Sequence, residues 1–143
     1  MSEFRTQRTY AIAPEALFAY VTEPANLVKW WGPEGMGLDE VALDLRRPGP
    51  WSLVLIGPDG SRHAMHGEVT SVTPPHTVEL TMNVPGEAKL GLSTVRFEIE
   101  PDGAGARFTL IQSGITDEMV EMGKHGWAST LRRLEKLMGL ADA

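Results

Sequence analysis

The sequence predicts an α+β fold in which a curved antiparallel sheet wraps around one long C-terminal helix. Residues 36–113 alternate apolar and polar side chains between turns rich in proline and glycine, which is typical of antiparallel strands. Residues 117–139 instead repeat apolar side chains at helical spacing. Because a curved sheet and a single helix cannot close on each other completely, the space between them is either filled by bulky side chains or left as a cavity.

The N-terminal segment predicts one strand followed by two short helices. Residues 3–12 alternate like a strand and end before Pro14, which favours a first helical turn because it has no N–H to satisfy. Glu15 suits the positive end of that helix. We expect Thr22 to cap the exposed amides of a second short helix, which runs to about Trp30.

About six strands in a meander account for residues 36–113. Val41, Leu43 and Leu45 share one face of the first of them. Residues 95–100 alternate apolar and charged side chains, so one face is buried and the other is solvated. Proline and glycine mark the turns, because glycine accepts the positive φ of tight turns and proline interrupts strand pairing. The turns are expected at residues 48–50, 58–61, 74–75, 85–86 and 101–105.

The long helix is expected over about Asp117 to Gly139. Thr116 or Asp117 can cap its N-terminus. Gly123 and Gly126 lie in its interior, where each costs about 1 kcal/mol relative to alanine but lets a strand, a helix or a ligand approach closely. The apolar stripe of this helix consists of Val120, Trp127, Leu131, Leu134 and Met138.

Length, charge and composition exclude several classes of protein. The 143 residues have the length of one domain, and we expect a single domain over residues 1–143 whose core needs no metal or disulfide. The formal net charge of −6 disfavours binding to nucleic acid or to an anionic membrane. The sequence contains no cysteine, which excludes disulfides, thiolate zinc sites, iron–sulfur clusters and cysteine nucleophiles. Residues 1–5 do not open a signal peptide and no window resembles a membrane span, so we expect a cytoplasmic protein.

Several stretches spread along the chain resemble one known family. In order, they are residues 13–18 (APEALF), 30–33 (WWGP), 74–80 (PPHTVEL), 93–97 (STVRF), 101–103 (PDG), 108–110 (FTL), 113–114 (SG) and 125–127 (HGW). Together they resemble the bacterial single-domain proteins that are similar to the C-terminal domain of the activator of heat-shock-protein-90 ATPase. These proteins belong to the START-like helix-grip (SRPBCC) superfamily.

The resemblance covers nearly the whole chain and implies one START-like helix-grip domain, with a cavity between the sheet and the long helix. The superfamily includes lipid carriers, plant hormone and allergen proteins, polyketide cyclases, self-resistance proteins and co-chaperones, so the fold does not imply one activity. The resemblance implies no shared catalytic triad. The heat-shock activator has an additional N-terminal domain that is not part of these 143 residues, which argues against a chaperone regulator.

Large apolar side chains are the main candidates for ligand contacts. The four tryptophans lie in or beside segments expected to border the space between sheet and helix, and each brings a large apolar surface and one N–H donor. Methionine adds flexible side chains that tolerate irregular ligands, although ordinary core filling explains the same residues. The candidate contacts are Trp30, Trp31, Trp51, Met65, Met82, Phe97, Phe108, Met122 and Trp127.

Three polar side chains are candidate anchors for a ligand. His66 and Glu68 are two residues apart and share one strand face, either as an acid–base pair in the cavity or as part of an exposed polar surface. His125 lies between the two helix glycines and faces a ligand, a strand or solvent. His63 and His66 point to opposite sides of an extended run, so we expect no metal site.

Three hypotheses about function follow from these features. The first is binding of a small hydrophobic or aromatic molecule in the cavity, without a metal or redox cofactor. The second is a cyclase or dehydratase-type enzyme, in which a buried histidine or glutamate moves protons on a polyketide-like substrate. The third is a protein-interaction module that regulates a chaperone ATPase through an exposed apolar or charged patch.

Overall fold

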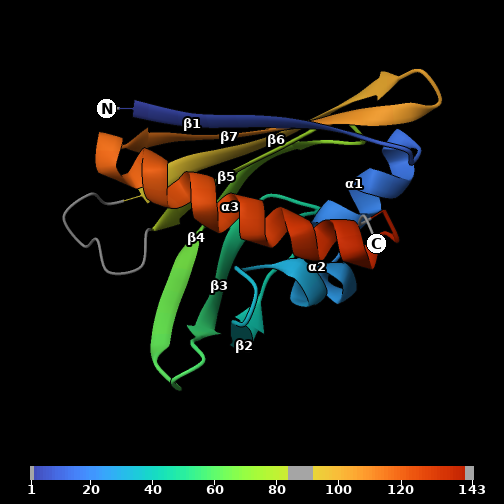
Figure 1. The fold of residues 1–143 in the computed structure, drawn as a ribbon. Coiled ribbons are helices and arrows are strands. Elements are labelled where there is room, and N and C mark those ends of the chain that lie inside the picture. The colour runs from blue at the N-terminus through green and yellow to red at the C-terminus, as the bar shows by residue number, and fades with distance from the viewer. Residues whose placement is uncertain (1, 84–91, 141–143) are drawn as a thin grey trace.

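In residues 2–83 and 92–140, which the computed structural model describes, seven strands form one antiparallel sheet that is accompanied by three helices (Figure 1). The spatial order of the strands is β1-β7-β6-β5-β4-β3-β2, so the first and last strands of the chain pair with each other. The elements are β1 (Ser2–Tyr10), α1 (Pro14–Thr22), α2 (Pro24–Trp30), β2 (Gly37–Ala42), β3 (Gly49–Ile56), β4 (Arg62–Thr73), β5 (Thr77–Asn83), β6 (Leu92–Asp102), β7 (Gly105–Ile115) and α3 (Asp117–Leu137).

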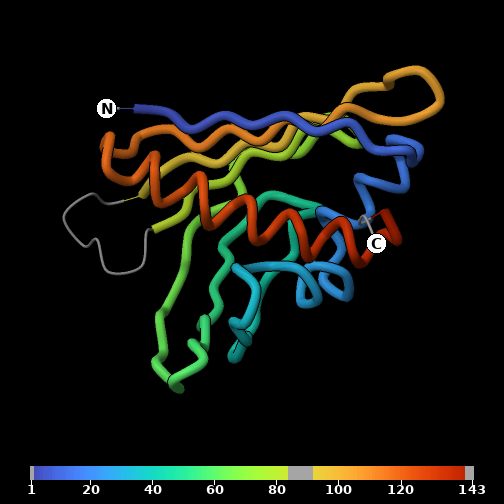
Figure 2. Tube along the Cα trace, in the orientation of Figure 1, coloured from blue at the N-terminus to red at the C-terminus, as the bar shows by residue number. Residues whose placement is uncertain are grey.

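The sheet is strongly curved, and α3 lies against its concave face. In Figure 1, β1, β7 and β6 run alongside α3, whereas β4, β3 and β2 turn away from it at the other side of the sheet. The trace in Figure 2 shows that α1 and α2 lie near the C-terminal end of α3. This arrangement confirms the predicted α+β fold with a sheet wrapped around the C-terminal helix.

The period-two pattern of the sequence separates the inner and outer faces of the sheet. In β6, Val95, Phe97 and Ile99 are buried, as predicted. Arg96 points to the outer face, where its guanidinium lies 3.1 Å from Glu79 Oε2 and also bonds a neighbouring glutamate of β6. The inner face therefore supplies the core, and the outer face carries half-exposed ion pairs.

The prediction that Thr22 caps the second helix is wrong. Thr22 is the last residue of α1, and its hydroxyl donates a hydrogen bond to the carbonyl of Phe18 at 2.6 Å. The N-cap of α2 is Glu23, which makes no side-chain capping bond. The hydroxyl instead bonds back to the carbonyl four residues earlier in its own helix, which is a common arrangement for threonine inside helices.

The predicted shared face of Val41, Leu43 and Leu45 is also wrong. Strand β2 ends at Ala42, and its pairing with β3 shifts register just before that residue. Val41 is 38% exposed, whereas Leu43 and Leu45 are buried beyond the end of the strand. The shift interrupts the strict alternation that the prediction assumed, because an irregularity in one strand changes the side to which the following side chains point.

The predicted hairpin turn at residues 58–61 is confirmed. Gly57 N donates to Ser61 O at 2.8 Å, and Gly60 has a φ of +84°, which favours glycine. The predicted turn at residues 85–86 lies outside the described residues.

Helix α3 begins and ends close to the predicted residues. Thr116 is its N-cap, and the threonine hydroxyl accepts a hydrogen bond from Met119 N at 3.3 Å. Trp127, Leu131 and Leu134 are buried as predicted. Met119 is buried too, whereas the predicted stripe members Val120 and Met138 are only partly buried. The buried stripe thus begins one residue earlier than predicted.

Candidate functional site

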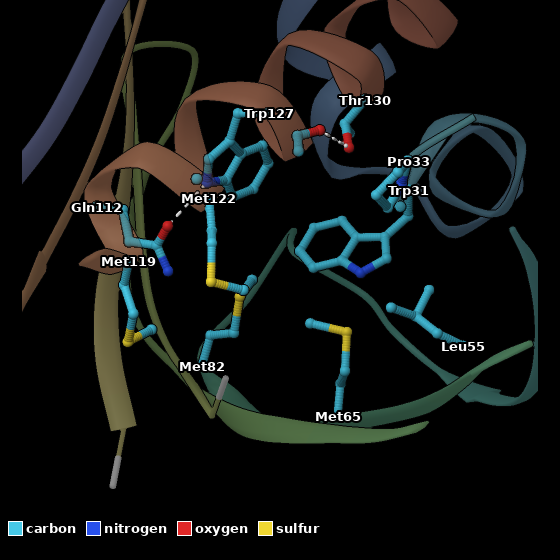
Figure 3. Close-up of a pocket in the computed structure, with 13 residues that line it drawn as sticks. Trp31, Pro33, Leu55, Met65, Met82, Gln112, Met119, Met122, Trp127 and Thr130 are labelled. Carbon is cyan, nitrogen blue, oxygen red and sulfur yellow. Dashed lines mark hydrogen bonds between the residues drawn. The ribbon is translucent and has the colours of Figure 1, made fainter. Parts of the chain in front are cut away.

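A cavity of about 290 Å³ lies between α3, the inner face of the sheet and the segment that follows α2 (Figure 3). Most of its lining is apolar or glycine, with one amide and one hydroxyl side chain. The lining residues are Trp31, Gly32, Pro33, Leu55, Met65, Met82, Gln112, Met119, Met122, Gly123, Gly126, Trp127 and Thr130.

Helix α3 forms one wall of the cavity with a single face. Its lining residues recur every three or four positions, which is the spacing of one helix face. Gly123 and Gly126 lie in the middle of this face and bring no side chain to the wall. A Cβ atom added at Gly126 would have no heavy atom within 4 Å, whereas one at Gly123 would lie 3.5 Å from Gln112 Oε1. The two glycines therefore leave space on the wall that any larger residue would reduce.

Three neighbouring strands form the opposite wall. Leu55 of β3, Met65 of β4 and Met82 of β5 are all buried and point to the inner side of the sheet (Figure 3). Met122 of α3 faces them across the cavity and is 60% exposed, so this side of the cavity lies at the surface. Methionine side chains adapt to irregular shapes because they are unbranched and polarisable, so this part of the wall can adjust to an occupant.

The buried amide of Gln112 is tied into a chain of hydrogen bonds. Trp127 Nε1 donates to Gln112 Oε1 at 2.9 Å, and Gln112 Nε2 donates to Ser93 Oγ at 3.0 Å. Ser93 Oγ in turn donates to Met82 O at 3.0 Å. These bonds fix the Trp127 indole against the sheet, since a buried polar group held at both ends has one favoured arrangement.

Trp31 forms the end of the cavity near α2. Its ring lies 5.6 Å from the ring of Trp51 and 6.4 Å from that of Trp127, with edge-to-face geometry in both pairs. Gly67 of β4 supports this arrangement, because a Cβ atom there would lie 1.9 Å from Thr81 O, the acceptor of the Trp51 N–H bond. The position of Trp31 thus depends on aromatic packing from two other elements.

Arg133 of α3 anchors the chain that carries Trp31. Its Nη1 donates to Trp31 O and Gly32 O, both at 3.0 Å, and its Nη2 donates to Lys29 O at 3.1 Å. These carbonyls lie at and just beyond the C-terminal end of α2, where a cation is favoured by the helix dipole. Gly32, with a φ of +91°, permits the turn that follows.

Five of the nine predicted apolar contact residues line the cavity: Trp31, Met65, Met82, Met122 and Trp127. The other four do not. Trp30, Phe97 and Phe108 are fully buried in the core, and the Trp30 N–H donates to Tyr20 O at 2.9 Å. Trp51 packs behind Trp31, and its N–H donates to Thr81 O at 2.9 Å.

The three predicted polar anchors do not reach the cavity. Side chains of β4 alternate between the two faces of the sheet. Met65 and Gly67 are buried on the inner face, so His66 and Glu68 are exposed on the outer face. His125 is exposed on α3, away from the lining face. The expectation of an acid–base pair inside the cavity is therefore corrected: the two side chains share a face, as period two requires, but it is the solvated face.

Sequence reasoning missed Gln112, Arg133 and Thr130. Gln112 had a visible signal, because it continues the buried positions Phe108 and Leu110 of β7 with a polar side chain. A polar residue in such a place needs a partner inside the protein. Arg133 gave no comparable signal, because its acceptors lie about 100 residues away in the sequence.

Among residues 2–83 and 92–140, none of those that line the cavity has an ionisable side chain. The clear pKa shifts among the described residues belong to groups elsewhere. Burial, together with a hydrogen bond to Glu135, raises the pKa of Tyr10. The Arg46 guanidinium lowers the pKa of Asp44 to about 2. In the described part of the chain, no three acidic or histidine side chains gather closely enough to hold a metal ion.

A family model described as activator of Hsp90 ATPase homolog 1-like protein matches residues 11–139. The chain belongs to this family. Solved structures agree with the assignment: the AHSA1 protein from Silicibacter pomeroyi is 38% identical with a TM-score of 0.87, and the match covers 97% of this chain and 99% of that chain. A protein from Chromobacterium violaceum is 26% identical with a TM-score of 0.85, over 98% of each chain. A protein from Nitrosomonas europaea is also 26% identical, with a TM-score of 0.80 over 96% of this chain and 94% of that chain.

The comparison with curated proteins finds no match. Membership of the AHSA1-like family confirms the resemblance and the helix-grip fold that the sequence predicted. None of the helices in the described residues has the length and hydropathy needed to span a membrane.

Proposed function

We propose that the protein binds a small, mostly apolar molecule in the cavity between the sheet and α3. The observation that carries this proposal is a space of about 290 Å³ bordered by tryptophan, leucine and methionine side chains that do not fill it. Protein interiors are close-packed and contain few voids larger than a water molecule. This cavity has about ten times the volume of a water molecule in the liquid, which is roughly 30 Å³.

The size of the cavity suits a molecule of about two fused rings. An apolar protein cavity of about 150 Å³ holds one benzene molecule, and this cavity is roughly twice as large. It lies at the lower end of the range for ligand pockets, about 300–1,000 Å³. The exposed Met122 side chain at the surface offers a place where a ligand can enter or extend.

The composition of the walls supports binding without catalysis. General acid–base catalysis needs an ionisable group within hydrogen-bond reach of the reacting atoms. The lining residues that the structure describes include none, and the predicted pair of His66 and Glu68 faces solvent. The cyclase or dehydratase hypothesis therefore finds no acid or base among the described residues of this cavity.

Regulation of a chaperone ATPase has less support than ligand binding. Such a role would use a contiguous docking surface. The exposed large apolar side chains of the described residues are Val28, Val41, Leu92 and Met122, and they come from four different elements.

The proposal is tested with three aromatic hydrocarbons of increasing size, whose relative affinities report how large a molecule the cavity accepts. Benzene, naphthalene and pyrene are titrated separately, and tryptophan fluorescence and the melting temperature are measured. We expect naphthalene to change the fluorescence and to raise the melting temperature most, because ligand at 100 times its Kd stabilises the folded state by about 2.7 kcal/mol. Pyrene should bind more weakly because it exceeds the cavity. The absence of any response to all three compounds would refute the proposal.

A further inference from the structure

Among the described residues of the cavity wall, Trp31 has an indole N–H that makes no hydrogen bond within the described part of the protein. Of the four tryptophans, three donate their indole N–H within the protein: Trp30 to Tyr20 O, Trp51 to Thr81 O, and Trp127 to Gln112 Oε1, each at 2.9 Å. The Trp31 N–H has no acceptor among residues 2–83 and 92–140, although the side chain is only 2% exposed.

The free N–H of Trp31 opens into the cavity. In the described part of the chain, every side-chain nitrogen or oxygen that is fully buried has a hydrogen-bond partner, so Trp31 Nε1 is not sealed in the core. Figure 3 shows the indole nitrogen on the side of the cavity bordered by Met65 and Leu55. Neither of these side chains offers a strong acceptor, since the methionine thioether accepts only weakly.

The two other polar side chains of the described wall, Gln112 and Thr130, already make hydrogen bonds within the protein. The Thr130 hydroxyl donates to Gly126 O at 2.9 Å. The Gln112 amide accepts from Trp127 and donates to Ser93. Because none of the described residues that line the cavity carries a positive charge, an anionic ligand would lose its hydration there without a compensating charge from them.

From this arrangement we infer that the ligand is a neutral apolar molecule that carries a carbonyl-type oxygen, and that this oxygen accepts a hydrogen bond from Trp31 Nε1. The inference rests on the proposed ligand-binding function and narrows it to a chemical class, such as a two-ring ketone. A hydrocarbon in the same place would leave the N–H buried and unpaired, which lowers the free energy gained on binding. The acceptor oxygen thus contributes specificity, while the methionine and tryptophan walls contribute apolar contact.

The test compares two probes of nearly equal size, 1-tetralone and tetralin, which differ by one carbonyl oxygen. Their Kd values are measured with the wild type, with Trp31→Phe and with Tyr10→Phe. The second variant also removes a side-chain hydrogen-bond donor, but one that is already bonded to Glu135 and does not line the cavity. We expect the affinity ratio of tetralone to tetralin to fall about tenfold in Trp31→Phe and to stay unchanged in Tyr10→Phe.

A spectroscopic measurement keeps the test independent of how well the variants fold. The carbonyl stretch of 1-tetralone bound to the wild type should lie at lower frequency than in hexane, because a hydrogen bond weakens the C=O bond. An unchanged ratio in Trp31→Phe, or an unshifted carbonyl band, would overturn the inference. If both probes bind but Trp31→Phe leaves their affinity ratio unchanged, or the carbonyl band is not shifted, the proposed function stands and the donor role of Trp31 fails. If neither probe binds, the proposed function itself fails.

Discussion

A larger side chain in place of Gly126 should weaken ligand binding without lowering the stability of the protein. Gly126 lies on the cavity face of α3, and a Cβ atom there would meet no heavy atom within 4 Å. Gly126→Ala should therefore stabilise the protein by up to about 1 kcal/mol, because glycine is the less favourable residue inside a helix. For a chain of 143 residues this corresponds to a rise in melting temperature of roughly 2–4 °C.

Gly126→Leu shares the gain in helix propensity but adds three more carbon atoms to a cavity of about 290 Å³. Their burial against the apolar wall contributes up to about 0.8 kcal/mol per carbon, so the variant should be at least as stable as Gly126→Ala. The same atoms occupy the space that a two-ring ligand needs. We expect the Kd for naphthalene to rise at least tenfold in Gly126→Leu and much less in Gly126→Ala.

The assay combines urea unfolding with naphthalene titration followed by tryptophan fluorescence. Lys124→Leu serves as the matched control, because Lys124 is exposed on α3 and does not line the cavity. It should leave naphthalene binding unchanged. A loss of stability in Gly126→Ala would show that the space beside the glycine is not open. A stable Gly126→Leu variant that binds naphthalene as tightly as the wild type would refute the placement of the ligand in this cavity.

Three further substitutions test residues that position the site or stabilise the fold. Arg133→Met should weaken naphthalene binding several-fold while α3 stays helical by circular dichroism, because it removes the anchor of the Trp31 segment; unchanged affinity would contradict that positioning role. Below pH 4 the wild type should lose stability as the pH approaches 2, because Asp44 has a lowered pKa of about 2 and its ion pair with Arg46 contributes only while the carboxyl is charged. Asp44→Asn should reduce the fall in melting temperature between pH 4 and pH 2, and equal slopes for the two proteins would contradict this. Thr116→Ala should cost about 1 kcal/mol in urea unfolding through the lost N-cap, whereas Thr116→Ser should cost much less.

The order and type of the elements could be predicted because they depend on short-range patterns. The alternation of residues 95–100 marks β6, and Thr116 followed by apolar residues at helical spacing marks α3. Each signal lies within one element, where backbone geometry alone relates the spacing of residues to the direction in which their side chains point. The prediction was wrong at Val41 because β2 contains an irregularity in its pairing with β3, which local alternation does not reveal.

The sequence by itself determined that His66 and Glu68 share a face and that a helix carrying two glycines lies over a curved sheet. Only the tertiary structure decided that this face is the solvated one, because the inner side of β4 is occupied by Met65 and Gly67. It also distinguished two adjacent tryptophans: Trp30 is sealed in the core, whereas Trp31 lines the cavity with an N–H that has no acceptor in the described part of the chain. The physical reason is that the direction of that indole is set by Arg133 and by two other tryptophan rings, which are distant in the sequence and meet only when the chain has folded.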